Sequence, residues 1–299
     1  MAPPPPSGIV CASRRRLWKS FGQKSHALAV GIATVQARGV PLSARCQAMP
    51  HRGIPDWRSN APYRALAACD APLIAWEWLR RDPAYRFAAA RGETDAGRFG
   101  LHRFEDPACS SALARVWWRR DVDPFVLSAA AAPCAGSEAF SPDLLPVAAA
   151  IERLAGAERL LVTDGAHSLR VDIVAGTLLE GPAHLTWQLP GLVAAAAPMH
   201  ALARFIALCR TGVLRRGTYP TPAGARRWAL LLRVSDALDA GASQRDIAEA
   251  FFGEDAIGRR WRVNAAARRT QIQRLVRQTR RLRAQPAARL LMPGAFRRR

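Results

Sequence analysis

Four helices are predicted after Gly191, because apolar residues there recur every three or four positions. The first helix has the apolar face Met199, Leu202, Ile206 and Cys209. The second has the apolar face Trp228, Leu231, Leu232, Ser235 and Leu238. Gly212 and Gly241 follow these two helices, and glycine readily adopts the left-handed conformation that ends a helix.

The other two predicted helices lie beyond Gly241. Ser243 can cap the shorter one, with Asp246 three residues on and Gly253 at its end. Asn264 can cap the long final helix, whose apolar stripe is Ile272, Leu275, Val276, Thr279 and Leu282. The short helix has the length of the first helix of a helix-turn-helix, but the ten residues 254–263 that follow exceed a compact turn of about three or four residues. A winged or expanded version remains open.

Alternating apolar and polar residues predict strands in the middle of the chain. Residues 160–163 and 169–174 flank Asp164-Gly165, which is a hairpin turn signal, and 184–191 can supply a third strand. His167 and His184 have no nucleophile or carboxylate at a spacing typical of catalysis. We therefore expect both histidines to be polar positions of a loop and a strand.

Aromatic residues are concentrated in residues 55–86: Trp57, Tyr63, Trp76, Trp78 and Tyr85. Leu73, Trp76 and Leu79 recur at helical spacing before Asp82-Pro83 ends the helix. Few basic residues interleave with these rings, so core packing is favoured over base stacking. Residues 99–127 alternate in short runs and predict short strands or extended loops.

These patterns predict an α+β protein: an aromatic-rich helical N-terminal module, a small central β-hairpin or sheet, and an all-helical, helix-turn-helix-like C-terminal domain. The expected boundaries are 49–130 for the N-terminal module, 131–146 for a linker rich in Ala, Pro, Ser and Gly, 147–190 for the hairpin region and 191–299 for the C-terminal domain. Residues 1–48 are basic and hold no acid, which fits a disordered arm, a mis-called start before Met49 or, less well, a transit peptide.

Charge is segregated along the chain. Residues 204–299 hold 22 arginines against six acids, whereas residues 49–203 have a net charge of −2. The basic residues are 42 Arg and two Lys, which indicates a GC-rich genome. Codon bias exchanges Lys for Arg, but it does not deplete acids from one segment only. The segregation therefore favours a polyanionic partner, most often nucleic acid.

Several classes of protein are disfavoured. The six cysteines include no CxxC pair and no histidine at ligand spacing, so we expect no metal site and no cofactor. The most apolar segment, 191–209, is interrupted by Pro198, His200 and Arg204, so we expect a cytoplasmic protein. A nuclease or recombinase would need clustered acids or a suitable nucleophile, but the acids of the basic third are dispersed and its one tyrosine is Tyr219. We therefore expect no enzyme.

The final helix is the expected double-stranded DNA contact, because arginine pairs with phosphates and guanine edges and a helix fits the major groove. Residues near its start would reach bases: Arg268, Arg269 and Gln271. Backbone contacts are expected from Arg274, Arg277, Arg280 and Arg281, with Arg259, Arg260 and Arg262 before the helix. If the helix is only an electrostatic anchor, reading of the sequence would fall to Gln244 and Arg245.

Three segments carry a resemblance to a known family: PDWR…AWEWLRRDPAYR (55–86), FGLHRFEDP…VWWRRDVDP (99–124) and RRWALLLRVSDALDAGASQRDIAEAFFG (226–253). They resemble a proteobacterial regulator family that combines a transcriptional-regulator-like domain with the domain of unknown function 2285. The family includes activators of excision and transfer of integrative conjugative elements, and a related activator of a secretion-system operon. The resemblance covers about residues 50–292 and implies sequence-specific DNA binding and activation of mobile-element genes.

The sequence thus predicts a DNA-binding transcriptional activator whose near-neutral N-terminal half contacts RNA polymerase or a small antiactivator protein. An architectural or excision-directionality factor that bends DNA is the alternative within the class of binding proteins. We also expect residues 191–299 to bind DNA as an isolated fragment.

Overall fold

A computed structural model describes residues 52–154, 156–214, 224–254 and 266–292, all of which belong to one compact unit. The basic segment 1–48 and Arg259, Arg260, Arg262 and Asn264 lie outside these described residues. The structure is mixed α and β, consistent with the α+β prediction, and its core is divided into two main hydrophobic clusters.

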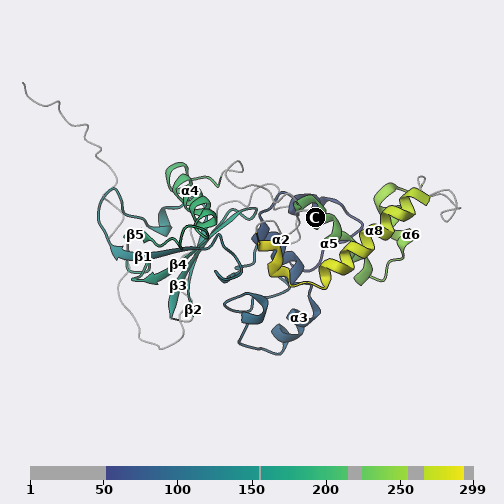
Figure 1. The fold of residues 1–299 in the computed structure, drawn as a ribbon, viewed down its shortest axis with the longest axis horizontal. Helices are drawn as coiled ribbons and strands as arrows, with labels where there is room; N and C mark the ends of the chain where they lie inside the picture. Colours follow the sequence, from purple (N-terminus) through teal and green to yellow (C-terminus); the bar gives the residue numbers. More distant parts are fainter. Residues whose placement is uncertain (1–51, 155, 215–223, 255–265, 293–299) are drawn as a thin grey trace, which may run out of the picture. The chain divides into compact units, whose positions relative to one another are not determined.

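The first cluster belongs to what we call the helical module, residues 52–126 with 224–292. Its N-terminal part holds α1 (Ala61–Leu66), α2 (Ala71–Leu79), α3 (Pro83–Ala90) and the short η2 (Gly97–Phe99). Its C-terminal part holds α5 (Ala225–Asp239), α6 (Gln244–Phe252), α8 (Ala266–Arg283) and η5 (Ala287–Leu291). Helix α5 packs against α1, α2 and α8, so both parts of the chain share one core (Figure 1).

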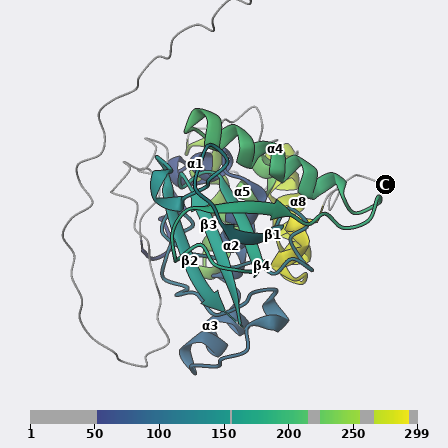
Figure 2. The same cartoon turned by 90° about the vertical axis from the view of Figure 1, so that its left-hand side faces the viewer.

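The second cluster belongs to the sheet module, residues 127–214. Its strands are β1 (Leu127–Pro133), β2 (Ala148–Leu154), β3 (Ala157–Thr163), β4 (Ser168–Ala175) and β5 (Ala183–Trp187), in the order β2-β3-β4-β1-β5. Only the β1–β4 pair is parallel. Helix α4 (Ala196–Thr211) packs on the sheet (Figure 2). The short η3 (Pro142–Leu144) comes between β1 and β2 along the chain.

The predicted hairpin is confirmed as β3 and β4, with Gly165 at φ 84° in the turn. The third predicted strand is confirmed as β5, but it pairs with β1 and not with the hairpin. Strands β1 and β2 were not predicted, because their alanine runs lack the β-branched alternation that marks a strand in the sequence. The expected linker 131–146 therefore differs from the structure: it contains the end of β1 and all of η3.

The predicted apolar face of α4 is wrong by one position. The helix ends at Gly212 as expected, but its buried residues are Pro198, Ala201, Phe205 and Leu208, and Met199, Ile206 and Cys209 are exposed. Phe205 sets this orientation, since its ring lies 5.1 Å from that of Phe140 and 5.0 Å from that of Trp187. Almost every position of α4 is apolar, so periodicity alone could not select the buried side.

The two modules meet through polar contacts. Asp70 caps α2 by accepting from the Leu73 amide at 3.2 Å, and its other oxygen accepts from the Ser168 amide of β4 at 2.6 Å. Arg170 of β4 donates to the Val116 carbonyl at 2.8 Å, and its guanidinium lies 3.9 Å from the Asp123 carboxylate. Burial raises the pKa of both Asp70 and Asp123.

Candidate nucleic-acid interface

Helix α8 presents one side to the core and the other to solvent. The predicted stripe is confirmed, because Ile272, Leu275, Val276, Thr279 and Leu282 are all buried. The Thr279 hydroxyl donates to the Leu231 carbonyl of α5 at 3.2 Å. At 1.5 Å per residue, the 18 residues of α8 span about 27 Å, which is long enough to follow a groove of DNA.

The solvent side of α8 carries a dense positive charge. Arg274, Arg277, Arg280, Arg281 and Gln271 are exposed. Within the described residues, none of these four arginines lies within salt-bridge distance of a carboxylate. Arg283 differs from them, because its guanidinium is 2.8 Å from Asp239 at the end of α5. The four arginines are thus the charges of α8 that remain available to an external anion.

The start of α8 holds the three residues that were predicted to contact bases, Arg268, Arg269 and Gln271. The guanidinium of Arg268 lies 5.8 Å from the ring centre of Phe252 at the end of α6, while the residue itself is exposed. Arg269 is only half-exposed, whereas Gln271 is exposed. Arg268 and Gln271 are therefore both accessible for a base contact.

Helix α6 has the predicted capping box, in which Ser243 and Asp246 satisfy each other's backbone amides. Gln244 and Arg245 are exposed on it, but Arg245 is 2.7 Å from the Glu249 carboxylate. Hydrogen bonds from Ser243 lower the pKa of Asp246, which keeps this residue negative. The two acids offset Arg245, so the start of α6 is not a basic surface.

An ion cluster that the sequence did not reveal holds α5, and through it α8, against the N-terminal part of the chain. Arg81 donates to both oxygens of Asp236, at 2.6 and 2.9 Å, and to Glu77 at 2.5 Å. Tyr63 donates to Asp236 at 2.6 Å. Burial would raise the pKa of Glu77, but Arg80 and Arg81 outweigh it and lower that pKa to about 2. All the charges are balanced within the cluster, which buried ions require.

Arg233 is a second connection between the same regions. Its guanidinium donates to the carbonyls of Trp57 at 2.7 Å, Arg58 at 2.8 Å and Ala250 at 3.2 Å. It also stacks 4.2 Å from the ring centre of Phe251. Arg233 thus fixes α6 to the start of the described chain. The only signal in the sequence was the presence of Arg233 and Asp236 within the apolar run of α5.

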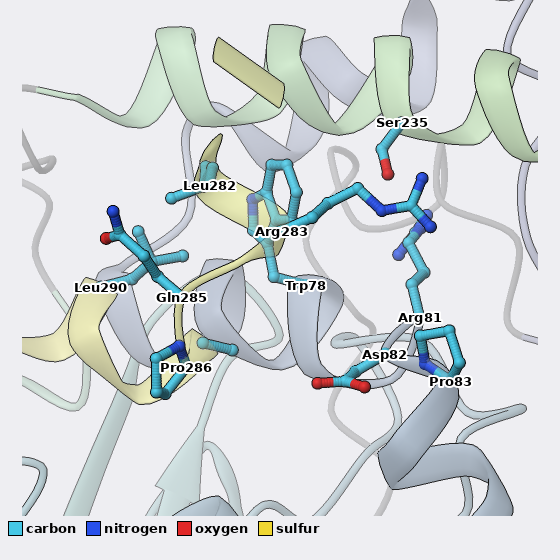
Figure 3. A pocket seen from close by; sticks show the side chains of 11 residues that line it. Trp78, Arg81, Asp82, Pro83, Ser235, Leu282, Arg283, Gln285, Pro286 and Leu290 are labelled. Carbon is cyan, nitrogen blue, oxygen red and sulfur yellow. The ribbon is translucent and has the colours of Figure 1, made fainter. Parts of the chain in front are cut away.

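A small pocket lies where α2, α5, α8 and η5 meet (Figure 3). Its volume is about 60 Å³, which is room for a few water molecules. Arg81 and Arg283 line it, but each is already paired with a carboxylate, Asp236 and Asp239 respectively. Asp82 also lines the pocket and caps α3 by accepting from the Ala84 amide at 2.8 Å, so both arginines of the lining are neutralised and the remaining charge is negative.

The described residues include neither a candidate metal site nor a candidate membrane-spanning helix. No group of three His, Cys, Asp or Glu side chains there could hold a metal ion. No helix among them has the length and apolarity needed to cross a membrane. The ring of His167 is 3.3 Å from Asp164 in the β3–β4 turn, and His184 is an exposed residue of β5, so they occupy the turn and strand positions that were expected.

Comparison with family models assigns a class to each part of the helical module. Residues 56–117 match the proteobacterial transcriptional regulator-like domain. Residues 188–291 match a family described as "T6SS, Transcription factor, DNA binding domain". No curated protein and no solved structure gives a significant match. The chain is a DNA-binding transcription regulator, and DNA is its partner.

Proposed function

We propose that the chain is a sequence-specific transcriptional activator that lays α8 in the major groove of double-stranded DNA. The observation that carries this proposal is the division of α8 into a buried stripe and a solvent side with four arginines that lack carboxylate partners among the described residues. Each phosphate neutralised by such an arginine releases counterions, which makes binding favourable and dependent on salt.

Gln271 and Arg274 lie three residues apart on the solvent side, so their side chains are neighbours on the helix. Glutamine and arginine form paired hydrogen bonds with adenine and guanine respectively, and we assign base contacts to these two residues. Arg277, Arg280 and Arg281 are assigned to the DNA backbone. Arg268 is exposed, but its guanidinium lies over the Phe252 ring, so we rank it after these two residues as a base contact.

We propose a binding role without catalysis. The described acids of α5 and α6 are committed to structure: Asp236 to Arg81, Asp239 to Arg283, Asp246 to the capping box and Glu249 to Arg245. Mobile-element excision or transfer genes are the proposed targets on the resemblance of the sequence. Secretion genes are the second candidate, because the matched DNA-binding family carries a T6SS description.

Selection of bound duplexes from a random-sequence pool tests this function. The proposal expects one enriched motif, loss of enrichment in the Gln271→Ala and Arg274→Ala variants, and increased transcription from a promoter that carries the motif. Enrichment of DNA without a motif would contradict sequence reading. Binding to the motif without increased transcription would favour an architectural protein over an activator.

A further inference from the structure

The DNA-facing surface continues from α8 onto the start of α5. Arg227, in the first turn of α5, donates a hydrogen bond through Nη2 to the side-chain oxygen of Gln278 on α8. Gln278 lies four residues after Arg274 and three before Arg281. Residues at these spacings lie on one side of a helix. The guanidinium of Arg227 is therefore beside the row formed by Arg274, Gln278 and Arg281.

Arg226 adds a second charge at the same place. Both Arg226 and Arg227 are exposed, and the first turn of α5 contains no acid. Within the described residues, no carboxylate lies within salt-bridge distance of Arg226. The start of α5 thus brings two positive charges to the edge of a surface that already has four.

The start of α6 is the competing neighbour for a second DNA contact. There Arg245 is paired with Glu249 at 2.7 Å, and Asp246 remains charged in the capping box. A phosphate near the start of α6 would face one arginine, Arg245, and two carboxylates, those of Asp246 and Glu249. The balance of charge therefore favours the start of α5.

We propose that Arg226 and Arg227 are further contacts to the DNA backbone, and that Gln278 is the positioning residue that holds Arg227 beside α8. This inference rests on the proposed role of α8. It makes the bound surface a two-helix surface, in which α8 reads the groove and the first turn of α5 grips the flanking phosphates.

The test is a fluorescence anisotropy titration of the full chain against a duplex that carries the selected motif, repeated over a series of salt concentrations. Each phosphate contact contributes about 0.9 to the slope of log affinity against log salt. We expect Arg226→Gln/Arg227→Gln to reduce the slope by about two and to weaken binding roughly 30-fold at about 0.15 M salt. Arg226→Lys/Arg227→Lys, which keeps both charges, should restore the slope.

The matched control is Arg86→Gln/Arg91→Gln, which removes two exposed arginines at α3 and changes the net charge equally. It should alter binding less than about twofold, because Arg86 and Arg91 lie outside the surface that we assign to DNA. An unchanged slope in the α5 variant, or an equal loss in the control, would overturn the inference. If the α8 variant Arg274→Gln/Arg277→Gln still loses affinity in that case, the proposed function survives without the α5 contact; if it does not, the proposed function fails as well.

Gln278→Met tests the positioning role, because it keeps the length of the side chain but cannot accept the hydrogen bond from Arg227. We expect a threefold to tenfold loss in affinity that disappears when Arg227 is already glutamine. Additive losses in the double variant would show that Gln278 acts independently of Arg227.

Discussion

The helical and sheet modules bury their cores in different ways. In the helical module, segments separated by more than 150 residues share one apolar core and one ion cluster, as the Arg81–Asp236 pair shows. The sheet module is continuous in sequence, and α4 covers a sheet formed from neighbouring segments. The sheet module is therefore an insertion between two parts of the helical module.

Charge follows the same division. The sheet module, residues 127–214, holds five arginines against seven acids. The helical module holds 27 arginines against 16 acids over residues 52–126 and 224–292. The DNA-binding family match, 188–291, begins directly after β5, includes α4 of the sheet module and continues into the helical module. The residues that match the DNA-binding family therefore do not form a separate folding unit. The segment that matches the regulator-like domain shares one core with α5 and α8.

The largest expected effect comes from separating the two parts of the helical module. The isolated fragment 191–299 should neither fold nor bind DNA, because it exposes Leu231 and Leu232 and leaves Asp236 without Arg81 and Tyr63. Circular dichroism and anisotropy measure both losses. This replaces the expectation from sequence that the fragment binds alone, and a folded, binding fragment would refute the shared core.

The next effect is the loss of charge balance in the buried cluster. Glu77→Gln leaves Arg80 and Arg81 without their shared carboxylate, which should lower the free energy of unfolding by about 3 to 5 kcal/mol. Chemical denaturation at neutral pH measures the change, and a loss below about 1 kcal/mol would contradict the cluster's role.

Glu77 also gives the helical module a pH dependence. Its pKa in the folded protein is about 2, below the ordinary value of 4.5, so its contribution is present above pH 4.5 and is lost as the pH falls toward 2. Asp70 and Asp123, between the modules, have raised pKa values in the folded protein. Their effect on stability is opposite to that of Glu77, because the free energy of unfolding falls as the pH rises through their raised pKa values. The unfolding free energy of Glu77→Gln should therefore fall less than that of wild type between pH 5 and pH 2. A parallel decline in both proteins would contradict this assignment.

A matched pair of core substitutions compares the modules directly. Leu232 in α5 and Leu160 in β3 are both fully buried. Each change to alanine should cost about 2 to 5 kcal/mol in unfolding free energy. When each variant is close to its own unfolding midpoint, only Leu232→Ala should weaken DNA binding, because α8 packs on α5. Equal effects on DNA binding would show that the sheet module also shapes the interface.

The smallest effect is expected at the start of α6. Arg245→Gln removes an exposed ion pair with Glu249, which is worth about 0.3 to 0.5 kcal/mol on a helix. DNA affinity should change less than twofold, since Arg245 is paired with Glu249 and lies outside the surface that we assign to DNA. A tenfold loss in an anisotropy titration would restore α6 as a reading element.

Local signals were strong enough to predict α6, α8 and the β3–β4 hairpin from the sequence. The Ser243 cap, the stripe through Ile272 and the Asp164-Gly165 turn each depend on residues close together in the chain. The shared core was not predictable in this way, because Arg81 and Asp236 are 155 residues apart. The aromatic residues were correctly predicted to be core residues. Helix α5 was predicted too, but its packing against these aromatic residues was not.

The sequence predicted the helix α8 and its arginines, but it did not predict which side chains from other helices lie beside them. The arginines of α8 were identified from their excess over acids, yet their directions depend on α5 and α6. The stacking of Arg268 on Phe252 and the bond from Arg227 to Gln278 both join helices that the sequence separates. Because of these contacts, we rank Gln271 and Arg274 ahead of Arg268 as base contacts and add Arg227 as a contact to the DNA backbone.

We expect the solvent side of α8 to bind DNA as part of the helical module. The most direct measurement compares Arg274→Gln/Arg277→Gln/Arg281→Gln with Arg64→Gln/Arg86→Gln/Arg91→Gln, three exposed arginines of α1 and α3 and the residue after α3, in salt-dependent titrations of the full chain. We expect the α8 variant to reduce the salt slope by about 2.7 and the control to leave it nearly unchanged. Equal slopes for the two variants would show that the solvent side of α8 is not the DNA-binding surface.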